Sequence, residues 1–263
     1  GLIPLAATAY PELVHDLLGH EGLKIIQRED LFRLSLDAAL LAAFVRINPR
    51  TRAIIDLGSG LGPLPLLLSC KTKAKITGIE INPDLCDLAR KSVALNQLTE
   101  QIAIIQDDIR VVHSRFAPAS FDIVVTNPPF FRLHDGFRRQ AASAVIAARH
   151  ETSIDFPTIA QQAKRLLKLG GLFVFIQRAG RLEELVQHLE KTAFAIKRIR
   201  YVHAKPDRPA LLMLVDAAAG GKRSGLRIEP PLFVHKPSGE YTEEALNIFN
   251  DKAGEYLETT SEL

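Results

Sequence analysis

Short apolar runs alternate with longer mixed segments through the middle of the chain. Apolar runs of strand length lie at 53–57, 75–80, 102–109, 121–126 and 172–176. Helices are expected over 63–70, 83–95, 156–169 and 181–191, the third ending at Gly170-Gly171. A closing pair of strands is expected at 194–202 and 209–215. The alternation predicts an α/β domain, with a mostly parallel sheet and helices on both of its faces.

The first 50 residues differ from this pattern. They contain an expected helix opening at Pro11, an extended stretch over 23–34 and a helix over 36–46. No polar or glycine-rich linker separates them from Arg52, so we interpret them as a cap on one edge of the core. A chain of 263 residues with 47% hydrophobic residues can form one large domain. We therefore predict a single domain over 1–263, with a cap at 1–50 and the core and tail at 51–263.

Composition narrows the functional classes only slightly. The formal charge of +3 and the pI near 8.9 suit a polyanionic partner mildly, because many soluble enzymes share such values. Cys70 and Cys86 lack the spacing of a zinc site or a disulfide framework, so we expect buried small side chains and no metal. No run of about 18 uncharged apolar residues and no basic leader is present, which predicts a cytoplasmic protein.

The motif Asn127-Pro128-Pro129-Phe130 directly follows the apolar run 121–126 and is suited to hold a planar amino group. The Asn127 side-chain oxygen and the Pro128 carbonyl are acceptors that can take the two hydrogens of an exocyclic amine. The prolines stiffen the loop, and Phe130 can stack on the ring that carries the amine. Taken alone, the motif fits an ordinary turn after a strand equally well.

A glycine-rich turn lies upstream. The apolar strand 53–57, which contains Asp56, leads into Gly58, Gly60 and Gly62. Glycines allow a tight turn and a close approach of backbone to ligand, and the following helix N-terminus can offer N–H groups. The next strand ends at Glu80, where an acid can hold ribose hydroxyls. Both features fit a dinucleotide site as well as an S-adenosylmethionine site.

The third and fourth strands distinguish these cofactors. The run 102–109 contains Asp107 and Asp108, suited to accept from an adenine amino group, and the next strand leads into Asn127. A hydride-transfer enzyme has no use for the latter motif. In combination and order, these residues resemble the amino-methylating class I S-adenosylmethionine-dependent methyltransferases. The resemblance implies a Rossmann-like fold with a seven-stranded sheet, an antiparallel last strand, and S-adenosylmethionine as the cofactor.

Segments outside these motifs resemble one family more closely, the bacterial valine-tRNA adenine-N6 methyltransferases, and within it the Gram-positive branch. The similar segments are 22–27, 31–42, 148–151, 166–171 and 220–241. The resemblance implies methylation of the adenine next to the tRNA anticodon, with Asn127, Pro128, Pro129 and Phe130 at the catalytic site. One departure is Leu61 and Gly62-Pro63, where relatives usually carry a polar and then an aliphatic residue.

Several alternatives stay open. The same motif also holds a glutamine amide in methyltransferases that modify release factors, and an idle scaffold or RNA-binding module could retain the fold. Ser35 and Asp37 can cap a helix or contact the cofactor, and Arg149-His150-Glu151 can contact cofactor or RNA or form a solvated pair. Residues expected to contact tRNA phosphates, if they are not ordinary surface charges, are Arg132, Arg138, Arg139, Lys222 and Arg223.

Overall fold

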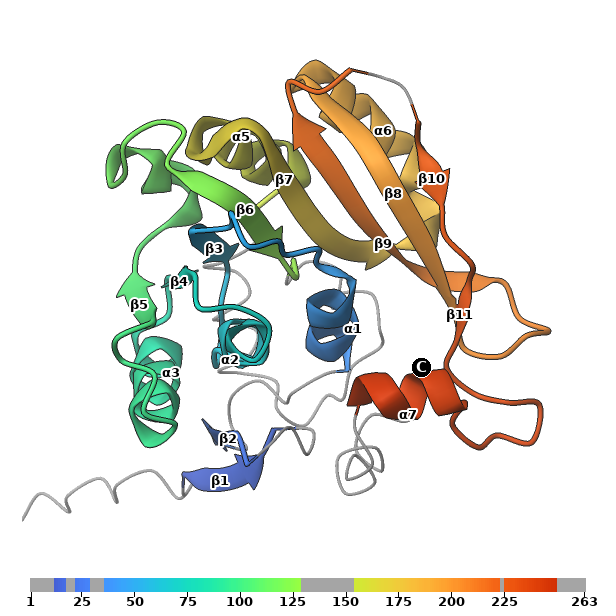
Figure 1. Ribbon diagram of the computed structural model, residues 1–263, viewed down its shortest axis with the longest axis horizontal. Helices are drawn as coiled ribbons and strands as arrows, with labels where there is room; N and C mark the ends of the chain where they lie inside the picture. Colours follow the sequence, from blue (N-terminus) through green and yellow to red (C-terminus); the bar gives the residue numbers. More distant parts are fainter. Residues whose placement is uncertain (1–11, 18–21, 29–35, 129–153, 223–224, 250–263) are drawn as a thin grey trace, which may run out of the picture.

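The computed structural model describes residues 12–17, 22–28, 36–128, 154–222 and 225–249. Its main feature is a nine-stranded sheet (Figure 1). Seven of the strands are β3 (Ala53–Leu57), β4 (Lys75–Glu80), β5 (Ile102–Gln106), β6 (Phe121–Thr126), β7 (Leu167–Arg178), β8 (Phe194–His203) and β9 (Ala210–Ala219). Two short strands, β10 (Arg227–Ile228) and β11 (Leu232–Phe233), pair with β8.

The strand order confirms the expected fold class. The strands β5, β4, β3, β6 and β7 lie side by side and are parallel, and β9 runs antiparallel between β7 and β8. The seven-stranded core and its antiparallel last long strand are therefore as predicted. The two short strands were not predicted, because two residues are too few to show a periodic pattern.

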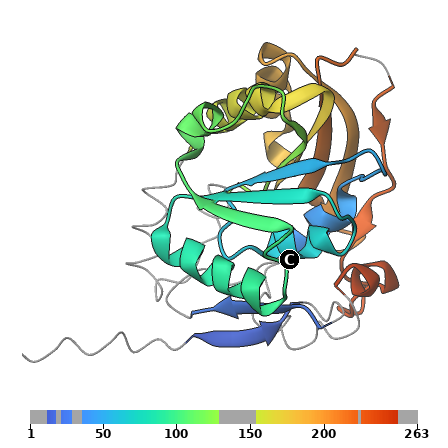
Figure 2. The ribbon, with the colours of Figure 1, turned by 60° about the vertical axis from the view of Figure 1, so that its left-hand side comes forward.

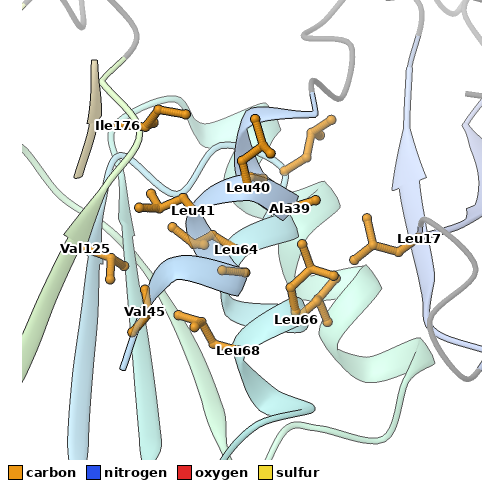
Figure 3. Close-up of a cluster of buried hydrophobic side chains, with 14 of the residues drawn as sticks. Leu17, Ala39, Leu40, Leu41, Val45, Leu64, Leu66, Leu68, Val125 and Ile176 are labelled. Carbon is orange, nitrogen blue, oxygen red and sulfur yellow. The ribbon is translucent and has the colours of Figure 1, made fainter. Parts of the chain in front are cut away.

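Alternate side chains of each inner strand enter two separate apolar layers. Ile54 and Val125 belong to one layer, whereas Ile55 and Val124 belong to the other. The first layer is packed against α1 (Asp37–Phe44), α2 (Pro63–Ser69) and α3 (Pro83–Leu95), and Figure 3 shows its centre. The second is packed against α5 (Phe156–Leu166), α6 (Leu182–Lys191) and the 3-10 turn η1 (Ile109–Ser114), which is followed along the chain by β6. Helices therefore cover both faces (Figure 2).

The N-terminal segment is a hairpin where we expected a helix at its start. Leu13–Asp16 forms β1, which pairs antiparallel with β2 (Lys24–Gln27). The hairpin lies beside α3, where the Ile26 N–H donates to Ser92 Oγ at 2.8 Å and the Lys24 N–H donates to Asn96 Oδ1 at 2.8 Å. The helix prediction is wrong because β1 pairs with β2, and the backbone of β2 is in turn held by α3, which is distant in the chain. The cap over residues 1–50 stays a prediction.

The helix expected over 156–169 ends three residues early. β7 begins at Leu167, and its register against β6 shifts between the pairs Phe121–Leu167 and Ile123–Leu172. Gly170 has a φ of +78° within this irregularity, and a Cβ on Gly171 would lie 2.9 Å from the Lys168 carbonyl oxygen. The glycine pair therefore forms a bulge in a strand, not the end of a helix. β5 also ends early, at Gln106, because Asp108 caps η1.

A buried ion pair attaches α1 to the sheet. Asp216 of β9 is fully buried, and its Oδ2 lies 2.7 Å from Arg198 Nε and 3.1 Å from Arg46 Nη2. The Arg198 guanidinium also donates to the Phe44 carbonyl at 2.6 Å and lies 3.9 Å from the centre of the Phe44 ring. Lys71 Nζ donates to two further carbonyls at the end of α1. Cations thus satisfy the last carbonyls of this helix.

No helix within the described ranges is long and apolar enough to cross a membrane.

The ion pair predicts a large effect of one substitution. Replacing Arg198 with Met should lower the free energy of unfolding by about 3 kcal/mol, because the buried carboxylate of Asp216 loses its closest cation. The half-exposed Arg46 stays, which places the expected loss at the lower end of the usual range. Urea unfolding measures it. The matched control, Arg200→Met, removes a more exposed pair with Glu244 and should cost less than about 1 kcal/mol. Equal losses would contradict the prediction.

Candidate functional site at the carboxyl edge of the sheet

The parallel strands bring most of the predicted site residues to one edge. Asp56 near the end of β3 lies beside Gly78 of β4 and Val125 of β6. Glu80, the last residue of β4, lies beside Gln106 at the end of β5. Because the carboxyl ends of parallel strands meet at one edge, the acids near the ends of β3, β4 and β5 and the amide after β6 share this edge.

The turn after β3 has the conformation that its glycines predict. Gly58, Gly60 and Gly62 have φ values of +87°, +55° and +86°, which other L-residues rarely adopt. The N–H groups of Gly58 and Ser59 donate to the Ile79 carbonyl at 2.9 and 2.8 Å. The turn is therefore attached to the end of β4 through its backbone.

The helix after this turn contributes less than expected. α2 has seven residues and begins at Pro63, with a second proline at position 65. Neither proline has an N–H, so the N-terminus of α2 can offer few donors. Ligand contacts in this region must come from the backbone of the turn.

Sequence reasoning missed Gly78, which allows the turn to approach β4. A Cβ on Gly78 would lie 2.8 Å from Ser59 Oγ and 2.9 Å from Ile104 Cδ1, closer than side-chain carbons approach other atoms. The available signal was a glycine inside a strand, which often marks a close approach of two backbones. Any larger residue here should displace the turn.

Glu80 connects the turn to the start of α3. Its Oε1 accepts from the Gly60 N–H and its Oε2 accepts from the Asn82 N–H, both at 2.9 Å. Asn82 in turn caps α3 by accepting from the Asp84 N–H at 2.9 Å. Each carboxylate oxygen can accept more than one hydrogen bond, so Glu80 retains capacity for hydroxyl donors from a ligand.

Asp56 lies deeper, beneath the turn. Its side chain is buried, and its Oδ1 has no hydrogen-bond partner within the described residues. Burial, with a further contribution from the nearby Glu80 charge, raises the pKa of Asp56 to about 8. Ser59 Oγ is likewise buried and unpartnered within the same part of the chain. These two oxygens can therefore accept hydrogen bonds that no other described residue donates.

Asp107 and Asp108 lie at the same edge, and both have basic partners. Asp107 Oδ2 accepts from Arg115 Nε at 2.8 Å. Asp108 Oδ2 accepts from Arg110 Nη2 at 2.6 Å, and the hydrogen bonds from Arg110 lower the pKa of Asp108. Both carboxylates therefore already act as hydrogen-bond acceptors at this edge.

The amide of Asn127 is the most informative group after β6. Its Oδ1 is buried and has no hydrogen-bond partner within the described residues, whereas the preceding Thr126 donates to the Leu57 carbonyl at 2.8 Å. Thr126 thus holds the end of β6 against β3, and Asn127 presents an acceptor that no other described residue uses. Pro128 is also buried. The predicted residues that lie outside the described ranges are Ser35, Pro129, Phe130, Arg132, Arg138, Arg139, Arg149, His150, Glu151 and Arg223.

Two expectations about residues around the site need correction. Lys222 follows β9, which runs antiparallel to the strands of the site, and its carbonyl accepts from Lys197 near the start of β8. Lys222 therefore lies at the opposite edge of the sheet. Asp37 is not the N-cap of α1, because the N-cap residue is Leu36, whose side chain forms no capping hydrogen bond. Asp37 is instead a buried residue of the first turn.

Several known proteins that are similar to this chain are named as methyltransferases. A family model described as methyltransferase small domain matches residues 33–202. A tRNA1(Val) (adenine(37)-N6)-methyltransferase from Porphyromonas gingivalis is 26% identical over 89% of this chain and 93% of its own length. A protein of the same name from Phocaeicola vulgatus is 29% identical over 66% of this chain and 71% of its own length. The crystal structure of a predicted O-methyltransferase from Agrobacterium tumefaciens, 24% identical, shares the fold with a TM-score of 0.64 over 81% of this chain and 95% of that one.

The burial of Asp56 predicts a pH dependence of stability. Its pKa is about 8 in the folded protein and near the ordinary 3.8 in the unfolded chain, so folding favours the protonated form. The contribution of Asp56 is full below pH 3.8 and is lost as the pH rises toward 8, by up to about 1.4 kcal/mol per pH unit. The Asp56→Asn variant should therefore gain stability relative to wild type between pH 5 and 8, as measured by urea unfolding without ligand.

The control is Asp155→Asn, at the N-cap of α5. A side-chain hydrogen bond from Thr158 lowers the pKa of Asp155, so its contribution is lost only in acid and its difference from wild type should be constant above pH 5. Parallel curves for wild type and Asp56→Asn over pH 5 to 8 would show that Asp56 is ionised in the fold.

Proposed function

The chain belongs to the methyltransferase small domain family, and on that premise we propose that it methylates the N6 amine of an adenine in tRNA, next to the anticodon. The names of the relatives from Porphyromonas gingivalis and Phocaeicola vulgatus support the choice of tRNA over a release factor. The match to a methyltransferase family supports an enzyme over an idle scaffold. Membership of the Gram-positive branch stays a prediction.

The cofactor of this family is S-adenosylmethionine, which supplies an electrophilic methyl group when bound. The residues of the carboxyl edge fit this molecule. Glu80 can accept from two ribose hydroxyls, and the unpartnered Oδ1 of Asp56 can accept from the ammonium group of the methionine portion. The glycine turn leaves room for backbone contact, and we assign Asp107 and Asp108 to the adenine amino group of the cofactor. Within the described ranges no cluster of possible metal ligands is present.

The unpartnered, buried oxygen of Asn127 is the observation that carries the proposal. An adenine N6 amine is a weak nucleophile, because its lone pair is delocalised into the ring. If Asn127 Oδ1 and the Pro128 carbonyl accept its two hydrogens, the nitrogen lone pair is directed out of the ring plane toward the methyl group. The proton then leaves the methylated nitrogen for solvent, so the reaction needs no strong base. Phe130 would stack on the base, and orientation would supply most of the acceleration.

An adenine in an anticodon loop is already partly unpaired, so its extrusion costs less than opening a duplex. Arg132, Arg138 and Arg139 follow the Asn-Pro-Pro-Phe motif, and we assign to them the contacts with tRNA phosphates, while the role of Arg223, outside the described residues, stays a prediction. Lys222 is no longer part of this set, because it lies at the other edge of the sheet.

One experiment tests the function as a whole. The protein is incubated with methyl-labelled S-adenosylmethionine and, separately, with tRNA, ribosomal RNA and a release factor. Nuclease digestion and mass spectrometry of the tRNA should then find N6-methyladenosine. Label on the release factor alone would replace the proposal with glutamine methylation, and a methyl group on a ribose or a pyrimidine would end it.

Glu80 should matter for cofactor affinity. Glu80→Ala should weaken S-adenosylmethionine binding by roughly 1–3 kcal/mol, about five- to 150-fold in Kd, because the ribose hydroxyls lose their acceptor. Titration calorimetry measures the change. A cofactor analogue without the two ribose hydroxyls serves as the control, since it should bind wild type and variant alike. A variant that weakens both ligands equally would mean that Glu80 only supports the turn.

Asn127 should matter for the chemical step. Asn127→Ala should lower kcat by about a hundredfold or more, the usual effect of removing one positioned polar group, while S-adenosylmethionine affinity stays unchanged. Asn127→Asp retains an acceptor and should recover part of the rate. Single-turnover methylation of tRNA, beside calorimetry with the cofactor, separates the two quantities. An unaltered rate in Asn127→Ala would contradict the assigned role.

A further inference from the structure

A second buried amide lies at the carboxyl edge, on the strand beside β6. The side chain of Gln177 is fully buried in β7. Its Oε1 accepts from the Arg178 N–H at 3.0 Å, and its Nε2 has no hydrogen-bond partner within the described residues. Because a backbone N–H needs an acceptor, this bond fixes the orientation of the amide and leaves the NH2 group as the unused end. A buried donor without a partner destabilises a fold unless a ligand uses it.

The position of Gln177 relates it to Asn127. The last pair between β6 and β7 is Thr126 with Phe175, after which β7 continues to Arg178 paired with β9 (Figure 1). β6 cannot extend the ladder, because Pro128 has no N–H to donate. Asn127 is one residue beyond the last pair and Gln177 is two residues beyond it. Neighbouring strands lie about 4.8 Å apart, so the two amides occupy adjacent strand ends.

The two amides differ in what they offer. Within the described residues, Asn127 has a buried acceptor without a partner, and Gln177 has a buried donor without a partner. Adenine has the complementary pair, since its N6 amine donates and the ring nitrogens N1 and N7 on either side accept. A 6-oxopurine such as guanine has an acceptor in place of the amine, so Asn127 Oδ1 would oppose it.

We propose that Gln177 is a specificity-determining residue that donates its Nε2–H to N1 or N7 of the target adenine while Asn127 holds the amine. This inference rests on the proposed function. By the alternation along the strands, Gln177 shares the face of Phe175 and Asn127 that of Val125. The two amides therefore approach from opposite faces of the sheet. A base that lies across the end of the sheet can contact both of them.

The test combines a protein change with an atomic change in the substrate. Wild type and Gln177→Met, which has a similar shape but no donor, are assayed on tRNA carrying adenine, 1-deazaadenine or 7-deazaadenine at the target position. For wild type, kcat/KM should fall about tenfold with one of the two analogues, the one that lacks the contacted nitrogen. Gln177→Met should be about tenfold slower on adenine and should not distinguish that analogue from adenine.

Two further variants exclude a purely structural role. Gln177→Glu replaces the donor with an acceptor of the same shape, and it should lose more activity than Gln177→Met while binding S-adenosylmethionine normally. Gln162→Met is the matched control: this buried glutamine of α5 accepts from the His113 N–H at 3.0 Å and donates to the Arg110 carbonyl at 2.9 Å. It should lower stability without changing the response to either analogue.

The outcomes are distinguishable. If each analogue slows wild type and Gln177→Met by the same factor, Gln177 does not contact the base and the inference is overturned. If Gln177→Met does not fold, the same substrates are compared for wild type and Gln177→Glu. If Gln177 contacts the base, one analogue should slow wild type and should not slow Gln177→Glu. If wild type methylates no tRNA adenine at all, the proposed function has failed instead.

Discussion

The glycine turn after β3 is hydrogen-bonded to the end of β4, and the arrangement of the site depends on that contact. The Ile79 carbonyl accepts from two consecutive N–H groups of the turn, and Gly78 has no side chain that would separate the two segments. The carboxylate of Glu80 then joins the turn to the start of α3. A displacement of the turn would therefore also move Asp56, the N–H groups of the turn and the start of α3.

Several buried polar groups at the carboxyl edge of the sheet have an atom without a hydrogen-bond partner within the described residues. Asp56, Asn127 and Gln177 each have a buried atom without a partner within the described residues, and each lies at or near the carboxyl end of a strand. Such groups destabilise a fold, because they lose hydrogen bonds to water without replacement. The two apolar layers on either side of the sheet offset this cost. A ligand that supplies the missing partners would stabilise the protein as it binds.

Polar contacts attach the peripheral elements to this core. The Asp216–Arg198 pair and the Lys71 ammonium hold the end of α1, while Ser92 of α3 and the C-cap residue Asn96 hold the backbone of β2. Each contact joins segments far apart in the chain. The positions of β2 and α1 therefore depend on the later strands and helices on which they pack.

The sequence alone determined the fold class, the strands that form the site, and the acids and amide at their ends. This was possible because the buried run of a parallel strand and the polar residue that follows it are neighbours in the chain. Only the tertiary structure decided that Leu13–Asp16 is a strand, that Gly170 lies in a bulge, that Lys222 is at the far edge, and that Gln177 lies beside the Asn127 strand end. The strand β1 depends on its pairing with β2, and the other three depend on pairings between residues distant in the chain. The register of such pairings is set by packing and hydrogen bonds that no local pattern records.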